Sequence, residues 1–401
     1  MRFPGFEGEW EVKKLGEITS WSSGGTPPKD NPLFWNGDIT WISASSMKGL
    51  VYSNSELKIT QAGLKKGSKL ASKGSLLILV RGSMLFNKIP IGIVSKDVAF
   101  NQDVKSIVVN DCSTSEYILN WFISSEPKIL NMVTGTGIGA GKLDLQDLKE
   151  LEIKIPSIPE QIKITSFLSI IDERIQTQNK IIEELKLLKN TLSKKIFSGQ
   201  LKFKDERGND FPERKIKKLG DVFYSEKGKG ISKNKIDANG KYGCVLYGEL
   251  YTRYNEVIFD IVSKTNEEDG LKSQVGDLLI PSSTTTTGID LANVTAINKE
   301  NVLLGGDITV LRTKEKINNI FYAYYLSNHK KEEIASYAQG STIVHLYYSH
   351  IKEMLIDIPS LQEQTRIALF LTSIDTKIDV EYQLLQELKE QKKYFLANLL
   401  I

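Results

Sequence analysis

Histidine is the side chain best suited to proton transfer near neutral pH, and this chain has only three of them. They are His329, His345 and His350, all in the second half of the sequence, so no acid–base or metal-binding set recurs in the first half. Cys112 and Cys244 stand apart, without the C-x-x-C spacing of zinc and redox sites. We therefore predict no catalytic residue and no metal ligand, and we interpret both cysteines as reduced packing residues.

Two other segments are similar to catalytic motifs but miss essential positions. In the glycine-rich stretch 135–142, GTGIGAGK, Thr136 stands where a phosphate-binding loop needs its first glycine, and Leu143 follows where Ser or Thr is required. Residues 31–34, NPLF, are similar to the Asn-Pro-Pro-Tyr/Phe motif of adenine methyltransferases, but leucine replaces a proline and no cofactor-binding glycine strand accompanies them. We interpret both segments as loops.

The elements that would position any site come in two copies. Residues 155–175 read IPSIPEQIKITSFLSIIDERI, residues 358–378 read IPSLQEQTRIALFLTSIDTKI, and the two match at 11 of 21 positions at a constant offset of 203. Upstream, residues 13–18, KKLGEI, correspond to residues 217–222, KKLGDV, at an offset of 204. The repeat indicates that each half holds one variable domain followed by one similar segment.

Each similar segment has the pattern of a long helix. Residues 157–160 and 360–363 fit the S-x-x-E capping box, in which the two side chains satisfy each other's backbone N–H groups. From there a 4-3 spacing runs through ten positions in each copy, eight of them apolar, which is typical of a coiled-coil seam. These positions are Ile164, Leu168, Ile171, Ile175, Gln178, Ile182, Leu185, Lys189, Leu192 and Ile196, and then Ile367, Leu371, Ile374, Ile378, Glu381, Leu385, Leu388, Lys392, Phe395 and Leu399.

We expect the two helices to pair with each other, because their seams match position by position. The first helix leads from one variable domain to the other and the second leads back, so the pairing should be antiparallel. The variable domains would then lie at opposite ends, with the chain termini close together. Roughly 40 residues at ~1.5 Å each give a helix of about 60 Å, which would act as a ruler. The alternative is that each helix packs only on its own domain.

Composition restricts the class of protein. A chain of 401 residues exceeds the size of most single cores and indicates two or more domains. With 40% hydrophobic and 25% charged residues and no apolar run of about 18 residues, we expect neither a membrane protein nor a disordered one. Residues 1–7 show no export signal, so a cytoplasmic location is expected. The net charge of +3 permits nucleic-acid binding but indicates it only weakly.

Both variable domains contain short runs of Ile, Val and Leu bounded by turn residues, which are typical of strands. Segments 118–123 and 143–148 fit a helix or a strand, whereas 320–327 with 334–337 indicate a helix. We therefore predict a mixed α/β domain, twice. The predicted strands are 38–43, 75–80, 91–98 and 104–109 in the first half, and 244–248, 276–280, 293–297 and 307–312 in the second.

Over the whole chain, the order of these motifs resembles the specificity subunit of type I restriction-modification systems. The motifs are the Lys-Lys-Leu-Gly-Glu/Asp that opens each half, the Ile-Pro-Ser-x-x-Glu-Gln that opens each helix, Ser23-Gly24-Gly25-Thr26-Pro27 and Asn101-Gln102-Asp103. The resemblance implies an α/β (mixed) fold with two target-recognition domains in a tandem pseudo-symmetric repeat, separated by two long antiparallel helices forming a coiled coil. It also implies that each domain reads one half of a bipartite DNA site and that the chain is not itself an enzyme.

The organisation implied is target-recognition domain 1 over residues 1–154, a first spacer helix over 155–200, a linker with target-recognition domain 2 over 201–357, and a second spacer helix over 358–401. The expected partners are double-stranded DNA, two methylation subunits docked on the helices, and restriction subunits, with no membrane. No cofactor is expected in this chain. S-adenosylmethionine, ATP and magnesium would be held by the partner subunits, which would carry out adenine methylation and ATP-dependent cleavage.

The second half departs from the first in two motifs. Residues 225–230, SEKGKG, stand in place of Ser-Gly-Gly-Thr-Pro, and residues 305–307, GGD, in place of Asn-Gln-Asp. The sequence does not determine the geometry of these two loops in the second half. Identical readers would bind a palindrome, whereas two different readers bind an asymmetric site. We expect a non-palindromic target.

For DNA contacts we select basic and amide side chains in predicted loops, because Arg, Lys, Asn and Gln read base edges and the cations also neutralise phosphate. Each of them is equally consistent with an ordinary solvated surface residue. Tyr251, Tyr254 and the run 284–287 are further candidates. The selected residues are Lys29, Arg81, Asn87 and Lys88 in the first domain, and Lys227, Lys229, Lys233, Lys235 and Arg253 in the second.

The residues alone leave two other classes open. A coiled-coil adaptor whose variable domains bind proteins would share this pattern, and a steep salt dependence of DNA binding would distinguish the two. An autonomous modifying or cleaving enzyme is disfavoured because the motifs are incomplete. A closer alternative is the specificity subunit of a related methylating nuclease with a different partner stoichiometry. Neither the bases read nor the spacer length follows from the sequence.

Overall fold

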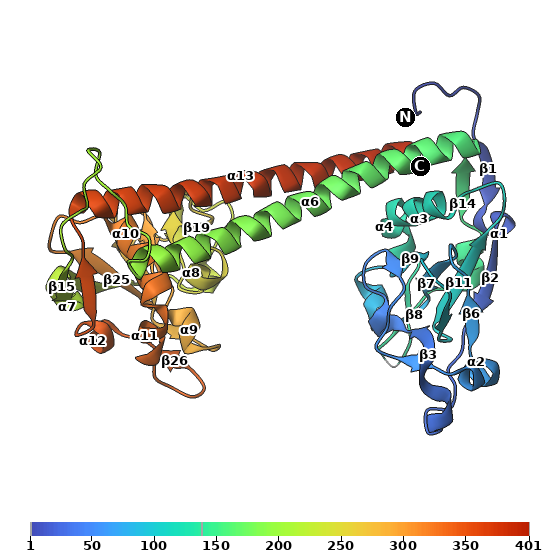
Figure 1. Ribbon diagram of the computed structural model, residues 1–401, viewed down its shortest axis with the longest axis horizontal. Helices are drawn as coiled ribbons and strands as arrows, with labels where there is room; N and C mark the ends of the chain where they lie inside the picture. The colour runs from blue at the N-terminus through green and yellow to red at the C-terminus, as the bar shows by residue number, and fades with distance from the viewer. Residues whose placement is uncertain (1, 138, 401) are drawn as a thin grey trace. The chain divides into compact units, whose positions relative to one another are not determined.

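The computed structural model describes residues 2–137 and 139–400, so Met1, Ile401 and the Ile138 of the glycine-rich segment lie outside the described residues. The chain folds into two compact units, unit 1 with residues Met1–Asn179 and Gln383–Ile401, and unit 2 with residues Lys180–Tyr382. Each unit is a mixed α/β domain that carries a stretch of both long helices (Figure 1). No described helix is long and apolar enough to cross a membrane.

Unit 1 is built on a five-stranded sheet in the order β2-β11-β7-β9-β4, antiparallel except for the β4–β9 pair. Both faces of β7 are buried, which explains its unbroken apolar sequence LLIL. A second sheet has the order β5-β3-β10-β6. The strands are β2 (Thr19–Ser23), β3 (Trp35–Ile42), β4 (Val51–Tyr52), β5 (Lys58–Ile59), β6 (Lys69–Ala71), β7 (Leu76–Leu79), β9 (Ile91–Val94), β10 (Val98–Phe100) and β11 (Val104–Val109), and the helices are α2 (Gln61–Gly67), α3 (Ser115–Ser124), α4 (Glu126–Leu130) and α5 (Leu145–Lys149).

Unit 2 repeats this plan with a five-stranded sheet in the order β16-β25-β21-β23-β18 and a four-stranded sheet in the order β19-β17-β24-β20. The prediction of a mixed α/β domain in each half is therefore confirmed. The strands are β16 (Phe223–Lys227), β17 (Tyr242–Val245), β18 (Val257–Ile258), β19 (Ser263–Thr265), β20 (Leu271–Lys272), β21 (Leu278–Pro281), β23 (Thr295–Ile297), β24 (Leu303–Leu304) and β25 (Ile308–Thr313), and the helices are α8 (Glu249–Thr252), α9 (Gly288–Leu291), α10 (Asn319–Tyr324), α11 (Lys331–Ser336) and α12 (Tyr348–Ile351).

The repeated Lys-Lys-Leu-Gly motif closes each domain against the strand that leads into its long helix. In unit 1, β1 (Glu11–Lys14) pairs with β14 (Glu152–Ile155) and continues into α1 (Leu15–Ile18). In unit 2, β15 (Lys215–Lys218) pairs in the same way with β27 (Leu355–Ile358) and continues into α7 (Leu219–Val222). The motif recurs because both copies need this short antiparallel ladder.

The two long helices are α6 (Ile158–Phe197) and α13 (Leu361–Leu399). In unit 1 the start of α6 packs on the end of α13, where the rings of Phe167 and Phe395 lie 4.9 Å apart. In unit 2 the end of α6 packs on the start of α13, where Lys189 Nζ lies 2.7 Å from Asp375 Oδ1. The helices therefore pair antiparallel, as predicted, and do not pack only on their own domains.

The two predicted capping boxes are wrong in the half that the glutamate side chain was expected to supply, and the serine half is seen at Ser360. The amide of Glu363 does donate to Ser360 Oγ at 3.2 Å. The Glu363 carboxylate, however, accepts a hydrogen bond from Arg214 Nη2 at 2.7 Å, and the fully buried Glu160 accepts from Arg2 and Trp10 at 3.1 and 3.3 Å. A charged or indole donor from the segment before each domain competes successfully with the helix's own backbone, because these glutamates are buried.

Residues near both ends of the chain meet in unit 1. The ring of Phe3 lies 6.0 Å from that of Phe167, which in turn contacts Phe395 near the end of α13. This agrees with the expectation that the termini are close.

Candidate nucleic-acid interface

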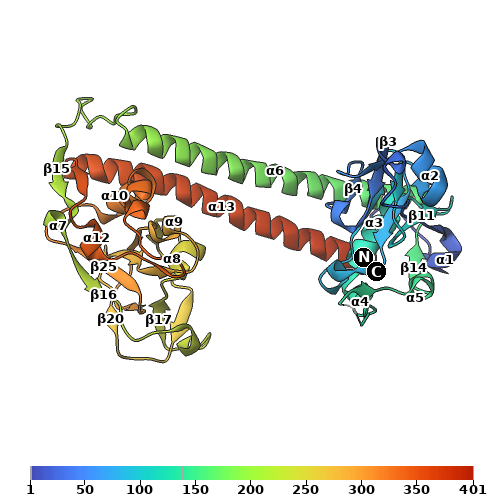
Figure 2. The same ribbon diagram turned by 90° about the horizontal axis from the view of Figure 1, so that it is seen from below.

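Three loops converge at one edge of the central sheet in each domain. Because β2, β11 and β7 are antiparallel neighbours, the end of β2, the start of β11 and the end of β7 lie together, as the pairs Ser23–Lys105 and Leu79–Val104 show. We call this the loop edge. In unit 1 it carries residues 24–28, 101–103 and 81–88, and in unit 2 residues 228–235, 305–307 and 282–287. It lies away from the long helices, near β3 and α2 in Figure 1 and near β17 and β20 in Figure 2.

Two sequence motifs come into direct contact at the loop edge of unit 1. The amide of Gly25 donates to the carbonyl of Phe100 at 2.9 Å, and Thr26 Oγ1 donates to Gln102 Oε1 at 2.6 Å. Trp41 Nε1 holds the loop by donating to the Gly25 carbonyl at 3.1 Å. Together these residues surround an open pocket of about 550 Å³ lined by Thr26, Lys29, Trp35, Trp41, Ser43, Leu57, Asn101, Gln102 and Asp103.

Unit 2 keeps the same backbone hydrogen bonds at this edge with different residues. Lys229 donates from its amide to the carbonyl of Leu304 at 2.9 Å, as Gly25 does to Phe100. The amide of Gly305 donates to Val245 at 2.9 Å, as Asn101 does to Ile42 at 3.0 Å. The two halves therefore share these hydrogen bonds, but the turns differ, because Asp307 has a φ of 59° and its counterpart Asp103 has no positive φ. The side chains presented on the loops also differ.

One shared glycine explains why the backbone is preserved. A Cβ atom on Gly24 would lie 2.1 Å from the carbonyl oxygen of Phe100, and one on Gly228 would lie 2.0 Å from that of Gly305. Only glycine permits this crossing of two backbones. It is the element common to the two otherwise dissimilar motifs.

We expect Gly228→Ala to lower the free energy of unfolding of unit 2 by about 2 kcal/mol, because backbone atoms must move apart to admit the methyl group. Gly306→Ala is the matched control, since nothing lies within 4 Å of its Cβ position. Thermal unfolding followed by circular dichroism compares the two variants. Equal losses from both substitutions would refute the close-approach explanation.

The glycine-rich segment of unit 1 forms a hairpin at the loop edge. Its strands β12 (Thr134–Gly135) and β13 (Gly141–Lys142) pair with each other, and β13 pairs with β8 (Arg81–Gly82). This places Lys142 directly opposite Arg81, two cations in one register position. Like charges placed opposite each other are unfavourable unless an anion lies near them, and Asp144 Oδ2 lies 4.0 Å from Lys142 Nζ. Sequence reasoning missed Lys142, although the rejected phosphate-loop pattern ended on it.

The counterpart in unit 2 is chemically different. There β22 (Ser283–Thr284) pairs with β26 (Val344–His345), so that Ser283 lies opposite His345. The His345 ring stacks on Tyr347 with centroids 5.6 Å apart. The candidate threonine run lies at the same edge, because Thr284 belongs to β22, and its Oγ1 lies 2.7 Å from Thr286 Oγ1. Position in the fold thus makes His345 a contact candidate, where the sequence indicated an ordinary histidine.

All nine predicted contact residues are exposed, but the structure does not bring them all together. Arg81, Asn87 and Lys88 lie at the loop edge of unit 1, and Lys29 follows it and lines its pocket. Lys229, Lys233 and Lys235 lie at the loop edge of unit 2, where Lys235 forms an ion pair with Glu267 at 3.1 Å, and Lys227 directly precedes it at the end of β16.

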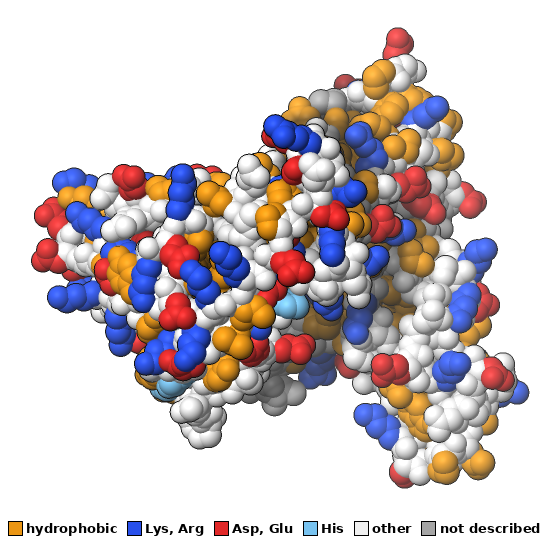
Figure 3. Space-filling view, turned by 60° about the vertical axis from the view of Figure 1, so that its left-hand side comes forward, with side chains coloured by type: hydrophobic (Ala, Val, Ile, Leu, Met, Phe, Trp, Pro, Cys, Tyr) orange, Lys and Arg blue, Asp and Glu red, His pale blue; other side chains and the backbone are white. Residues whose placement is uncertain are grey.

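Arg253 and Tyr254 already serve structural roles in unit 2. Arg253 Nη1 lies 3.3 Å from Glu249 Oε1, and the amide of Val262 donates to Tyr254 Oη at 3.1 Å. Burial raises the pKa of Tyr254. These two residues are therefore weaker contact candidates than the loop lysines. On the surface shown in Figure 3 the basic side chains are interspersed with acidic ones, so position at the loop edge matters more than charge density.

The remaining chemical candidates lie away from the loop edges. His329 contacts the rings of Phe197 and Tyr325, and burial lowers its pKa. Cys244 is buried and Cys112 partly so, and both are free thiols. Within residues 2–137 and 139–400, no three His, Cys, Asp or Glu side chains are grouped to hold a metal ion.

A two-domain protein with this duplicated framework matches a known family model twice. The model is that of the type I restriction modification DNA specificity domain, and it matches residues 7–187 and 213–390. The chain therefore belongs to this family, with one match for each domain.

Individual relatives support the same assignment. The chain is 27% identical over 372 residues to the type I restriction enzyme MjaIX specificity subunit of Methanocaldococcus jannaschii, covering 88% of this chain and 83% of that protein. It is 36% identical over 168 residues to the EcoR124I/EcoR124II specificity subunit of Escherichia coli, an alignment that spans less than half of either protein, 41% and 42% respectively.

Solved structures show the same fold. The S subunit of a type I restriction-modification system from M. genitalium superposes with a TM-score of 0.55 at 18% identity, covering 97% of this chain and 95% of that one. A chain from a structure on complex assembly and conformational transition of the type I R-M system superposes with a TM-score of 0.61 at 16% identity, covering 97% and 96%.

Proposed function

We propose that this chain reads two different half-sites of one bipartite DNA sequence, one at the loop edge of each domain, and so directs separate subunits that methylate adenine and cleave DNA with ATP. The observation that carries the proposal is that the two loop edges share their backbone hydrogen bonds and close crossing but present unlike side chains. Arg81 and Lys142 face each other in unit 1 where Ser283 and His345 do so in unit 2. Such a pair of readers fits an asymmetric site.

The side chains at the loop edges are suited to reading rather than to catalysis. Arginine and lysine reach guanine and phosphate, whereas hydroxyl and amide groups contact base edges in several ways. We propose that the partners are double-stranded DNA, two methylation subunits and restriction subunits, in the cytoplasm. S-adenosylmethionine, ATP and magnesium would belong to those subunits, and the present chain would be non-catalytic.

The decisive experiment is single-molecule sequencing of host DNA for modified adenine, with and without this gene, in cells that co-express the neighbouring methylation and restriction genes. A two-part, non-palindromic motif that disappears on deletion supports the proposal. A palindromic motif contradicts the asymmetric reading. If no methylated motif depends on the gene while the partner subunits are active, the result supports the alternative of a coiled-coil adaptor that binds proteins.

We expect Arg81→Ala and Lys142→Ala each to weaken binding of the full chain, with its methylation partners, to specific DNA. If each residue contacts a phosphate, the slope of log affinity against log salt should fall by about 1 per substitution. Lys73→Ala is the matched control, because Lys73 is exposed and precedes β7 at its opposite end. Titrations over a salt series measure the slope. Equal behaviour of all three variants would remove the hairpin from the interface.

A further inference from the structure

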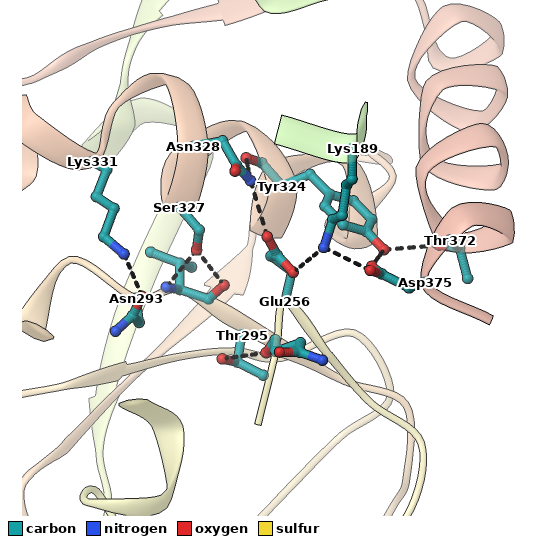
Figure 4. Close-up of polar contacts among 12 residues, drawn as sticks. Lys189, Glu256, Asn293, Thr295, Tyr324, Ser327, Asn328, Lys331, Thr372 and Asp375 are labelled. Atoms are coloured by element: carbon teal, nitrogen blue, oxygen red, sulfur yellow. Dashed lines mark hydrogen bonds and ion pairs between the residues drawn. The ribbon is translucent and has the colours of Figure 1, made fainter. Parts of the chain in front are cut away.

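A buried lysine in unit 2 joins the two long helices to the recognition domain. Lys189 of α6 lies 2.7 Å from Asp375 Oδ1 of α13 and 2.7 Å from Glu256 Oε2, which directly precedes strand β18 of the domain (Figure 4). Tyr324 Oη donates to Asp375 Oδ2 at 2.5 Å, and Asn328 Nδ2 donates to Glu256 Oε1 at 3.1 Å. All three charged side chains are at most 17% exposed.

Unit 1 contains only part of this arrangement. Lys392 of α13 lies 2.5 Å from Asp172 of α6, and these residues are the 203-residue counterparts of Lys189 and Asp375. The Lys–Asp pair is therefore a property of the repeated helices. It explains why a lysine interrupts both apolar seams.

The third charge is present in unit 2 alone among the described residues. The carbonyl of Glu256 accepts from the amide of Ala296 at 2.8 Å, and in unit 1 the same backbone place is held by Leu50, whose carbonyl accepts from Ile93 at 2.9 Å. Leu50 is 39% exposed and cannot pair with a cation. Within residues 2–137 and 139–400, only the second recognition domain thus reaches the helix ion pair with a carboxylate.

The charge state of the group follows from its surroundings. Burial raises the pKa of Glu256, but Lys189 and the hydrogen bonds from Lys189 and Asn328 outweigh it, so this pKa lies below its ordinary value. Burial lowers the pKa of Lys189, but the carboxylates of Glu256 and Asp375 raise it by more, so this pKa lies above its ordinary value. At neutral pH the Lys189–Glu256 pair is therefore ionised.

We propose that Glu256 is a positioning residue that locks the second recognition domain onto the helix pair in one orientation, a device that the first domain lacks. The consequence for DNA reading rests on the function proposed above. The apolar contacts between this domain and the helices, through Ile196, Phe197, Ile367 and Leu371, are not directional. The ion pair is directional, and because the carbonyl of Glu256 holds strand β23, the pair fixes the edge of the central sheet.

The first test needs no DNA. In the full chain, Glu256→Gln should speed hydrogen exchange at the amides of Ala296 and Asn298, which bond to carbonyls of Glu256 and Ile258, by about tenfold or more, because the buried Lys189 loses the one of its two carboxylate partners that belongs to the recognition domain. Leu50→Gln is the matched control and should leave the corresponding amide of Ile93 unchanged. Unchanged exchange in Glu256→Gln overturns the lock, whatever the DNA result.

Charge inversion tests the same idea by rescue. In unit 1, Lys392→Asp combined with Asp172→Lys should restore the thermal stability lost in each single variant, because no third charge is present. In unit 2, Lys189→Asp combined with Asp375→Lys should fail to do so until Glu256→Lys is added, because Glu256 would otherwise face a new aspartate. Equal rescue of the two double variants overturns the assignment of Glu256.

The functional readout is methylation by the complete complex of duplexes whose second half-site is shifted by one base pair. Glu256→Gln should reduce the discrimination against shifted sites about tenfold while leaving the sequence preference within each half-site intact. If Glu256→Gln speeds hydrogen exchange but leaves the discrimination against shifted half-sites unaltered, the role of Glu256 is purely structural and the proposal that it positions the domain is overturned. If the unmodified complex shows no bipartite preference at all, the proposed function fails and the exchange result stands by itself.

Discussion

Replacing Gln161 with leucine is expected to lower the free energy of unfolding of unit 1 by about 4 kcal/mol, because four polar groups lose their partner in a dry environment. Gln161 is fully buried at the start of α6. Its Oε1 accepts from Ser113 Oγ at 2.9 Å and from the amide of Thr114 at 3.0 Å, and its Nε2 donates to the carbonyls of Cys112 and Pro156 at 3.0 and 2.9 Å.

The second copy of the motif provides the control. Among the residues that the structure describes, Gln364 Oε1 accepts only from the amide of Asn318 at 2.8 Å, and Nε2 donates only to the carbonyl of Pro359 at 2.8 Å. Gln364→Leu should therefore cost unit 2 about half as much, near 2 kcal/mol.

Tryptophan fluorescence separates the two units in this experiment. All five tryptophans, Trp10, Trp21, Trp35, Trp41 and Trp121, lie in unit 1. Urea unfolding followed by tryptophan emission should shift for Gln161→Leu and not for Gln364→Leu, whereas circular dichroism reports both. An equal loss of stability for the two variants by circular dichroism would contradict the hydrogen-bond explanation, whereas a fluorescence shift for Gln364→Leu would show that the two units unfold together.

Replacing Arg312 with methionine is expected to destabilise unit 2 by about 3–5 kcal/mol, because it leaves the buried carboxylate of Asp277 without its cation. Arg312 Nε and Nη2 donate to the two oxygens of Asp277 at 3.0 and 3.1 Å, and Nη1 lies 2.9 Å from Glu226 Oε1. The side chains of Arg312 and Asp277 are 9% and 3% exposed.

The control removes both charges. Arg312→Met combined with Asp277→Asn should lose less stability than Arg312→Met alone, because no unpaired charge then remains buried. Circular dichroism in urea measures both losses, and the tryptophan transition of unit 1 should stay in place. A double variant that loses as much as the sum of its single variants would show that the two residues act independently.

The sequence by itself determined the duplication, the long helices and their antiparallel pairing. These depend on periodic apolar positions such as Ile164, Leu168 and Ile367, which are fully buried as the seam required. Periodicity is a local property, so it can be recognised without knowing the fold. The polar seam positions were visible too, but their meaning was not, since Lys189 and Lys392 acquire their roles from aspartates on the facing helix.

Only the tertiary structure decided which side chains share a site. The order β2-β11-β7 brings Gly24, Arg81 and Asp103 to one edge, although they are widely separated along the chain. Strand order and register also placed Lys142 opposite Arg81 and gave the buried Glu160 partners other than its own helix. Contacts of this kind arise from burial and strand pairing between distant segments, which leave no periodic pattern in the sequence.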